Sequence, residues 1–283
     1  MDARLQRRVQ RYGWDLAAAD YEALWAEQLA PAQDALLQRA ALAPGERVLD
    51  VACGTGLVTL AAARAVGRGG HALGVDLSER MVEAARSRAL ASGVEPVTFA
   101  RMDAERLDLS EASVDVALCA LGLMYVPEPE AALRELRRVL RPGGRLVAAV
   151  WGERARCGWA PLFEIVDAEV RSEVCPLFFR LGQGDTLARL AADAGFGAIH
   201  SQRIVTTMDY ADGDAACRAA FAGGPVALAW SRFDADTRAR VNARYLESLE
   251  PWRRGGRYRV PAEFVVLAAV ASADSADPLN TGA

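Results

Sequence analysis

Lysine is missing from this chain of 283 residues, and every basic residue other than the two histidines is arginine. The protein therefore has no side-chain amine for Schiff-base or general-base chemistry. Histidine is scarce, and the cysteines are scattered without a Cys-x-x-Cys pair. These cysteines are Cys53, Cys119, Cys157, Cys175 and Cys217. We expect no disulfide framework, no metal site and a reducing, cytoplasmic environment.

A positive charge excess and a long hydrophobic run are also missing. The formal net charge is −4, so we do not expect nucleic acid as a partner, because its phosphates require a basic face. The longest apolar run, "FVVLAAVA" at Phe264–Ala271, is too short for a membrane span and predicts a buried strand. The N-terminal stretch "MDARLQRRVQRYGW" has no apolar core, so we expect no secretory signal.

The patterning that is present divides the chain into four segments. Residues 1–43 have apolar residues at helical spacing, interrupted at Pro31, and predict an N-terminal helical cap. Residues 44–152 alternate strand-like and helix-like runs and predict a Rossmann-like core. Residues 153–272 predict a lid insertion followed by the C-terminal part of the sheet, and residues 273–283 predict a flexible tail.

The alternation in the core predicts the fold class. Strands that alternate with helices need crossover connections, which give a parallel sheet with helices on both faces. Two late strand-like runs, "AIHSQRIVTTMDY" and "RVPAEFVVLAAVA", are separated by a helical segment. We therefore expect an α/β protein with a doubly wound, mostly parallel sheet, N-terminal helices and an inserted lid.

The stretch "RVLDVACGTG" places a turn of small residues directly after the first predicted strand of the core. Gly54 and Gly56 remove side chains that would keep a ligand away from the backbone. Asp76 follows the next strand, where a carboxylate can accept hydrogen bonds from both hydroxyls of a ribose. A dinucleotide fingerprint would need a third glycine at position 59, which is Thr59, so a nucleoside without a diphosphate is favoured.

The third strand of the core adds a group for a purine base. In "VTFARMDAERLDL", Asp103 lies just past the strand end, where it could accept from an adenine amino group. The backbone N–H of Ala104 would face a ring nitrogen of the same base. Three neighbouring strand ends are thus suited to an adenosine laid across the top of the sheet.

Four motifs in this order, "VLDVACGTG", "GVDLSERMVEAAR", "RMDAERLDL" and "ALGLMYVPEPEAALRELRRVLRPGGRLVAAVWG", resemble the class I S-adenosylmethionine-dependent methyltransferases. The similarity is greatest to the subgroup of ubiquinone and menaquinone biosynthesis, and it covers residues 44–152. One departure is Ala52, which stands where the family turn often has its first glycine. The resemblance implies a seven-stranded sheet whose last strand pair is antiparallel, and S-adenosylmethionine as the cofactor.

The resemblance also implies roles for individual residues. Asp50 would lie beneath the methionine moiety, Asp76 would hold the ribose hydroxyls and Leu77 would pack on the adenine. Asp103 and Ala104 would contact the adenine edge. The remaining predicted cofactor contacts are Tyr21, which would close over the cofactor, Ala52, Gly54 and Gly56 around the methionine and ribose, and Ala120 and Leu121 near the methionine.

The methyl acceptor is less well defined by the sequence. Trp151, Trp159, Phe178 and Phe179 either line an acceptor pocket beneath the lid or simply pack in the core. If they line it, the acceptor is a small apolar, aromatic or quinone-like metabolite, and no residue is assigned as a catalytic base. We expect a cytoplasmic bacterial methyltransferase, with two alternatives: a non-catalytic S-adenosylmethionine-binding module, and a nicotinamide-dependent oxidoreductase.

Overall fold

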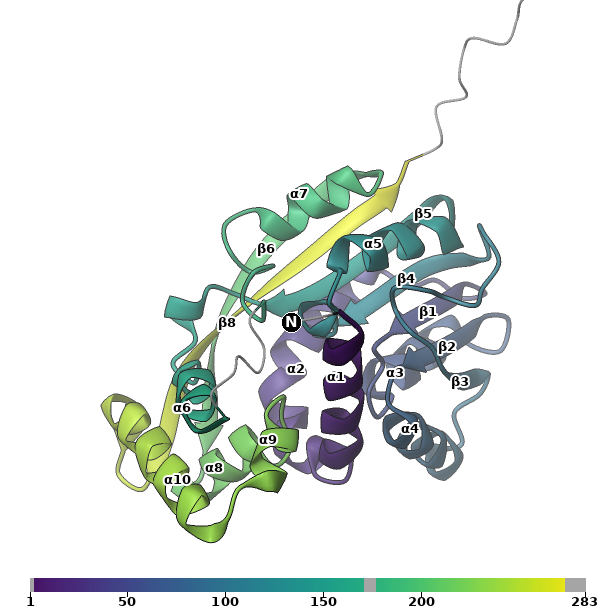
Figure 1. Ribbon diagram of the computed structural model, residues 1–283. Helices are drawn as coiled ribbons and strands as arrows, with labels where there is room; N and C mark the ends of the chain where they lie inside the picture. Colours follow the sequence, from purple (N-terminus) through teal and green to yellow (C-terminus); the bar gives the residue numbers. More distant parts are fainter. Residues whose placement is uncertain (1–2, 171–176, 273–283) are drawn as a thin grey trace, which may run out of the picture.

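The computed structural model describes residues 3–170 and 177–272 as a twisted sheet covered by helices (Figure 1). The strands are β1 (Arg47–Val51), β2 (His71–Asp76), β3 (Val97–Arg101), β4 (Val114–Ala120), β5 (Leu140–Trp151), β6 (Phe196–Tyr210), β7 (Arg253–Arg254) and β8 (Arg257–Ala271). Their order is β3-β2-β1-β4-β5-β8-β6, with β7 paired to β8. The expected seven-stranded sheet is confirmed, with the two-residue β7 as an addition.

Helices occupy most of the connections between the strands. They are α1 (Ala3–Ala17), α2 (Tyr21–Ala40), α3 (Leu57–Val66), α4 (Glu79–Ser92), α5 (Pro129–Val139), α6 (Pro161–Val170), α7 (Thr186–Asp193), α8 (Gly213–Phe221), α9 (Ala227–Arg232) and α10 (Ala235–Leu249), with 3-10 turns η1 (Leu123–Tyr125), η2 (Arg154–Arg156) and η3 (Glu250–Trp252). None of the helices in the described parts of the chain combines the length and hydrophobicity required to cross a bilayer.

The sheet is doubly wound around the pair β1 and β4. Strands β3, β2, β1, β4 and β5 are parallel, whereas β8 runs antiparallel to both β5 and β6. The expected antiparallel pairing of the last two long strands, β6 and β8, is confirmed. From β1 the chain steps outward to β2 through α3, and from β4 it steps the other way to β5 through α5. Because such crossovers are right-handed, α3 and α5 cover opposite faces of the sheet. The order of connections therefore reverses between β1 and β4.

The two N-terminal helices have different surroundings. Helix α2 packs on β4, β5, β6 and β8 and belongs to the helical layer of the sheet, whereas α1 packs against α4 and α9. Pro31 does not interrupt α2, contrary to the sequence expectation; the helix continues through it to Ala40. The predicted division at residues 43, 152 and 272 stays a prediction, and the predicted tail lies outside the described residues.

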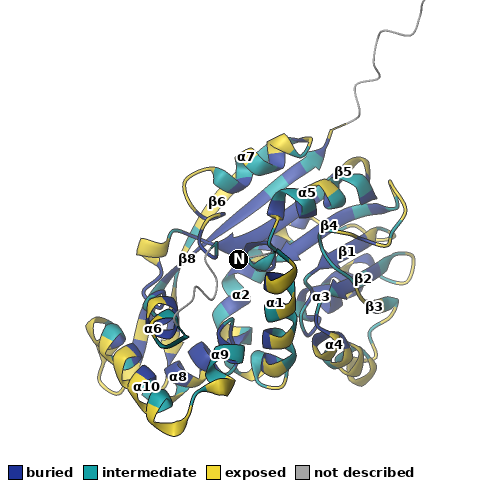
Figure 2. Ribbon diagram, in the orientation of Figure 1, coloured by how far each residue is buried: buried dark blue, intermediate teal, exposed yellow. Residues whose placement is uncertain are grey.

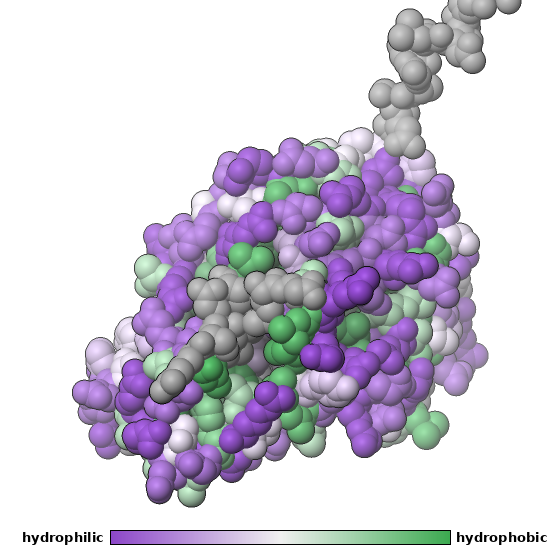
Figure 3. Space-filling view, viewed as in Figure 1, coloured by the Kyte–Doolittle hydropathy of each residue, from purple (hydrophilic) through white to green (hydrophobic). Residues whose placement is uncertain are grey.

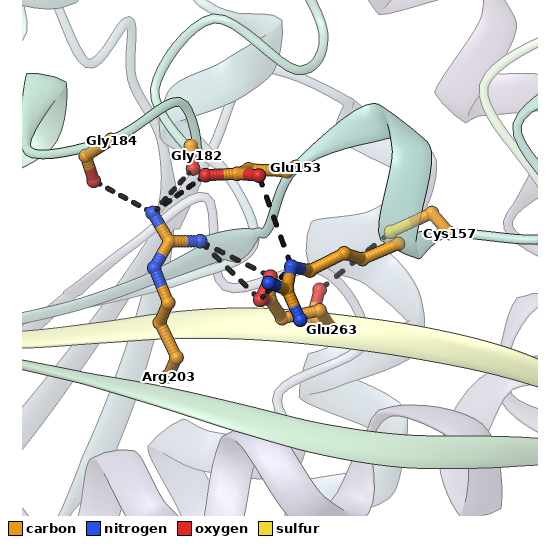
Figure 4. Close-up of polar contacts among 7 residues, drawn as sticks. Glu153, Cys157, Gly182, Gly184, Arg203 and Glu263 are labelled. Carbon is orange, nitrogen blue, oxygen red and sulfur yellow. Dashed lines mark hydrogen bonds and ion pairs between the residues drawn. The ribbon is translucent and has the colours of Figure 1, made fainter.

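An ion-pair network around a single buried carboxylate joins the late strands to the segment after β5 (Figure 4). Glu263 on β8 is 1% exposed, and Arg203 on β6 donates to its carboxylate at 3.1 Å. The same guanidinium donates to the carbonyl oxygens of Gly182 and Gly184 at 3.0 and 2.7 Å. Arg156 lies 3.6 Å from the Glu263 carboxylate. The network therefore fixes the loop before α7 against the antiparallel strand pair.

Replacing Arg203 with methionine should leave the buried Glu263 charge with only Arg156 near it. Removing the partner of a buried charge costs about 3 kcal/mol when nothing compensates that charge. Because Arg203 is 33% exposed and Arg156 stays near Glu263, we expect the free energy of unfolding to fall by less, about 1–2 kcal/mol. The double variant Arg203→Met with Glu263→Gln should recover much of the loss. Guanidinium unfolding of both variants tests this, with Arg189→Met, an exposed pair partner, as the control. An equal, small effect of Arg203→Met and the control would contradict it.

Candidate functional site

A cavity open to solvent, with about 1010 Å³ of empty space, lies at the carboxyl ends of the parallel strands. The loops after β1, β2, β3 and β4 all reach it, and α1, α2 and the aromatic segment after β5 close its sides. Open α/β sheets bind ligands where the order of connections reverses, which here is between β1 and β4. The fold therefore places the cavity where a ligand site is expected.

The carboxylate of Asp76 is fixed at the cavity wall by backbone donors. The N–H of Gly54 donates to Oδ2 and the N–H of Ser78 to Oδ1, both at 2.9 Å. Burial raises the pKa of Asp76, and these hydrogen bonds oppose that shift. Ser78 also caps α4 by accepting from the Met81 N–H at 3.1 Å. Asp76 is thus oriented before any ligand binds.

Asp50, at the end of β1, is 1% exposed and only partly hydrogen-bonded. The Thr59 hydroxyl donates to its Oδ2 at 2.6 Å, whereas its Oδ1 has no partner among the described residues. Burial raises the pKa of Asp50 to about 7, and Asp76 contributes to the increase. The fully buried Thr59 side chain occupies the position of the third glycine of a dinucleotide fingerprint. This packing disfavours a diphosphate at the start of α3.

Two residues at the strand ends have left-handed backbone conformations that non-glycine residues rarely adopt. Ala52, after β1, has φ of 56°, and Leu121, after β4, has φ of 62°. The two loops are in close contact, because a Cβ at position 122 would lie 2.4 Å from the Ala52 Cβ. Strained residues persist where the surrounding structure holds them, which is common at ligand sites. Both line the cavity.

Helix α1 closes the cavity over the end of β3. The guanidinium of Arg7 lies 3.2 Å from Asp103 and also pairs with Glu105, while the Glu105 N–H donates to Asp103 Oδ1 at 3.0 Å. Gln10 and Trp14 lie on the same side of the helix and line the cavity with Arg7. The sequence analysis assigned none of these three residues to the site, although their i, i+3, i+7 spacing marks one side of a helix.

Aromatic side chains form the rest of the wall. The ring of Trp14 contacts Tyr21 and Tyr125 edge-on, with centroids 5.7 and 5.0 Å apart. Tyr125 continues to Phe178 at 5.3 Å, and Phe178 to Trp159 at 5.5 Å. Such edge-to-face contacts between rings are stabilising and hold the rings in place. The aromatic residues lining the cavity are Trp14, Tyr21, Trp25, Tyr125, Trp151, Trp159 and Phe178.

The structure brings most of the predicted cofactor contacts to one cavity. Those lining it are Tyr21, Ala52, Gly54, Asp76, Leu77, Asp103, Ala104, Ala120 and Leu121. Asp50 lines a smaller adjoining cavity of about 290 Å³, which shares Tyr21, Ala52, Gly54 and Ala120 with the larger one.

Two predicted site residues lie elsewhere. Gly56 lines neither cavity; a Cβ there would be 3.0 Å from the Phe99 ring and 3.1 Å from Ala85, so this glycine lets α3 approach its neighbours closely. Phe179 lies behind Phe178, with the Arg154 guanidinium 5.8 Å from its ring centroid, and does not line the cavity. Of these two consecutive phenylalanines, Phe178 thus lines the cavity and Phe179 packs outside it.

Charge is unevenly distributed around the cavity. Within residues 3–170 and 177–272, the charged residues that line it are Arg7, Asp76 and Asp103, which come from the end where α1 and the loops after β2 and β3 meet. Burial raises the pKa of Tyr21, and the nearby Asp76 and Asp50 raise it further, so its hydroxyl keeps its proton at neutral pH. Among the described residues, no group of acidic, histidine or cysteine side chains is arranged to hold a metal ion.

Residues 48–144 match a known family, described as a methyltransferase domain. A ubiquinone/menaquinone biosynthesis C-methyltransferase of Azotobacter vinelandii is 45% identical over 104 residues, which are 36% of this chain and 41% of that protein. An uncharacterized protein from a Streptomyces fradiae transposon is 40% identical over 154 residues, 54% of this chain and 44% of that protein. The matched region is thus less than half the length of either relative.

Solved structures share the fold over most of the chain. The YcgJ protein of Bacillus subtilis has a TM-score of 0.62 at 18% identity, covering 86% of this chain and 99% of that one. A phosphoethanolamine N-methyltransferase of Haemonchus contortus, in complex with phosphomonomethylethanolamine and S-adenosylhomocysteine, has a TM-score of 0.60 at 18% identity, covering 92% of this chain and 58% of that one. The [4+2]-cyclase SpnF has a TM-score of 0.58 at 21% identity, covering 90% and 85%. These similarities establish the fold.

The raised pKa of Asp50 makes stability depend on pH. Between its ordinary value of 3.8 and its folded value of about 7, the folded protein holds a proton that the unfolded chain has lost. The stabilising contribution is therefore complete below about pH 4 and is lost as the pH rises through about 7. Asp50→Asn removes this dependence. As the pH rises from about 4 to 7, the free energy of unfolding of the variant minus that of wild type should therefore increase by up to about 1.4 kcal/mol per pH unit.

Urea unfolding of Asp50→Asn and wild type between pH 5 and 7.5 measures this difference. The exposed Asp108→Asn is the matched control and should show no such slope. A constant difference between Asp50→Asn and wild type across this range would show that Asp50 is already ionised in the folded protein.

Proposed function

We propose that this chain transfers a methyl group from S-adenosylmethionine to a small, largely apolar or aromatic metabolite. Its residues 48–144 match the methyltransferase domain family, and the fold is that of the class I S-adenosylmethionine-dependent methyltransferases. The observation that carries the proposal is the joint placement of Asp76, Asp103 and the strained loops after β1 and β4 around one cavity. Each group suits a different part of an adenosine joined to a methionine.

The residues present fit this cofactor. Asp76 turns a fixed carboxylate toward the cavity, where it would accept from the ribose hydroxyls, and Leu77 would lie against the adenine ring. Asp103 and the Ala104 N–H would contact the adenine edge. The unpartnered Oδ1 of Asp50 supports a polar or cationic ligand group in the adjoining cavity. When bound, S-adenosylmethionine supplies an electrophilic methyl group on a positively charged sulfur.

The chain's own contribution is positioning, electrostatics and exclusion of water. Trp14 and Tyr21 close the cavity above the strand ends, and the carboxylates of the buried Asp50 and the half-buried Asp76 favour positive charge near them when they are ionised. The face of an aromatic ring such as Tyr21 favours a cation in the same way. Holding two reactants in line within an enclosed site supplies a large part of the acceleration of a transfer reaction. No dedicated base is needed for this contribution.

The acceptor's chemistry follows from the other part of the wall. Trp25, Trp151, Trp159 and Phe178 line it, and the described charged residues of the cavity lie at the opposite end. Neither His71 nor His200 lines the cavity. An apolar or aromatic acceptor suits these walls, and its nucleophilic atom must be reactive without a histidine or lysine base. An electron-rich aromatic carbon or an acidic hydroxyl meets that requirement.

A non-catalytic S-adenosylmethionine-binding module is the alternative to this proposal. The similarity to a protein named as a [4+2]-cyclase shows that the fold by itself does not specify methyl transfer. Turnover separates the two possibilities. Purified protein incubated with S-adenosylmethionine and a panel of phenols, quinols and indoles should form S-adenosylhomocysteine with at least one acceptor. Tight cofactor binding without turnover on such a panel would favour the module.

Asp76→Ala should weaken S-adenosylmethionine binding, because the ribose hydroxyls lose a charged acceptor. A hydrogen bond to a charged group contributes about 1.5–3 kcal/mol, which corresponds to a loss of affinity of about ten- to a hundredfold. Isothermal titration calorimetry measures the change. Glu83→Ala, an exposed carboxylate on α4, is the control and should bind as wild type does. Unchanged affinity of Asp76→Ala would overturn its assigned role.

Phe178→Leu should raise the KM for the methyl acceptor with little change in cofactor affinity. The loss of one aromatic contact is worth about 0.5–1.5 kcal/mol, or about two- to twelvefold in KM. Phe179→Leu is the matched control, since this neighbouring ring is equally buried but does not line the cavity. Steady-state kinetics on any acceptor found in the panel tests this. Equal effects of the two variants would place the acceptor away from Phe178.

A further inference from the structure

Helix α1 has an unusual distribution of polar and apolar residues. Its buried side consists of Gln6, Gln10, Gly13 and Ala17, with the two glutamines only 7% and 6% exposed. Large apolar side chains lie on the outside of the same helix. An amphipathic surface helix normally does the reverse and buries its apolar side. This inverted arrangement indicates that the outer side of α1 is a binding surface for an apolar partner.

The outer apolar residues form one row along the helix. Leu5, Tyr12 and Leu16 are 39%, 46% and 49% exposed, and Val9 lies between them, half-buried. Their spacing of i, i+4, i+7 and i+11 places them on one side of a helix. We call these four residues the α1 stripe. In the described parts of the chain, the other exposed large apolar residues, Leu90 and Val205, lie apart on α4 and β6.

Arginines flank the α1 stripe. Arg8 is exposed and Arg11 is half-buried, with its guanidinium 4.6 Å from the centroid of the Tyr12 ring. Within Ala3–Ala17 there are four arginines and one acidic residue, Asp15, whose carboxylate accepts from the Ser78 hydroxyl at 2.6 Å. A protein with a net charge of −4 thus has a basic helix on its outside. Figures 1 and 2 show α1 at the front of the molecule, with exposed residues along it.

We propose that the outer side of α1 docks on an anionic lipid surface. The α1 stripe would enter the boundary between headgroups and acyl chains, and Arg8 and Arg11 would pair with lipid phosphates. Helices with an apolar side flanked by arginine bind membrane interfaces in this way. The inner side of the same helix forms part of the cavity wall through Arg7, Gln10 and Trp14. Docking would therefore hold the cavity close to the lipid, where an apolar small molecule is concentrated.

A second copy of the chain is a poorer occupant for this surface. Packing α1 against its symmetry mate would bring the two sets of arginines together, and like charges on adjacent helices are destabilising. Stable dimers also bury about 800 Å² on each partner, far more than four partly exposed side chains provide. Figure 3 shows that the surrounding face is mainly hydrophilic, with separate apolar patches, and so does not extend the α1 stripe into a broad apolar interface. An anionic lipid surface offers acyl chains to the α1 stripe and phosphates to the arginines beside it.

Co-sedimentation with phosphatidylcholine vesicles containing 30% or no phosphatidylglycerol tests the proposal. The full chain should bind the anionic vesicles and lose binding as the salt concentration rises. Leu5→Glu with Leu16→Glu should lower the partition coefficient at least about tenfold, because two inserted apolar side chains become charged. The control Leu90→Glu replaces an equally large, more exposed leucine on α4 and should bind as wild type does. Arg8→Gln and Arg11→Gln should each lower binding about fivefold.

The outcomes separate this proposal from the proposed function. Cofactor affinity, measured by calorimetry on each variant without vesicles, should not change, since none of these side chains lines the cavity. The proposal is overturned if wild type does not bind anionic vesicles, or if Leu90→Glu loses binding as strongly as the double variant. It is also overturned if light scattering shows a wild-type dimer that the double variant lacks. None of these results bears on methyl transfer.

Discussion

The structure depends on the reversal of connections between β1 and β4. Because the chain steps outward from these two strands in opposite directions, the loops that follow them diverge and leave an opening at the sheet edge. Ala52 and Leu121 occupy left-handed conformations at the two sides of this opening, and Gly122 allows the loops to touch. The N–H of Gly54, from the first of these loops, fixes the carboxylate at the end of β2. The strained conformations of the two loops and the orientation of Asp76 therefore both follow from the reversal of connections between β1 and β4.

Helix α1 connects this opening to the outside of the molecule. At one end, Arg7 pairs with Asp103 and Glu105 beyond β3, and at the other, Asp15 accepts from Ser78 at the start of α4. Both anchors lie on the core beside the cavity, at Asp103 and Glu105 for Arg7 and at Ser78 for Asp15. Of the two glutamines that the helix buries, Gln10 lines the cavity on the same side as Arg7. The α1 stripe lies on the outer side of the helix and is available for contacts outside the chain.

The core and its site could be predicted from sequence because they depend on local patterns with a fixed spatial meaning. Parallel strands end at one edge, so Asp50, Asp76 and Asp103 had to lie near one another once three strands were recognised. The contribution of α1 depends on how this helix docks on strand ends that are distant in the sequence, and no local pattern around Arg7 identifies its partners. The different positions of Phe178 and Phe179 are set by side-chain direction in an irregular segment, which composition does not encode. Gly56, which the resemblance assigned to the cofactor, lines neither cavity, and it lets α3 approach Phe99 and Ala85 closely.

The electrostatics of the cavity favour a particular kind of ligand. Asp50 is buried and Asp76 is half-buried at adjacent strand ends, and the negative charge of Asp76 raises the cost of ionising Asp50. Their hydrogen-bond donors among the described residues are the Thr59 hydroxyl for Asp50 and the backbone N–H groups of Gly54 and Ser78 for Asp76. Two such carboxylates repel a diphosphate and attract a cation, because the low dielectric of a closed site strengthens both effects. The buried Thr59 hydroxyl reinforces this preference by donating to Asp50 from the position at which a dinucleotide would require a glycine. A preference for a cationic ligand and a preference against a diphosphate therefore have the same physical origin in this chain.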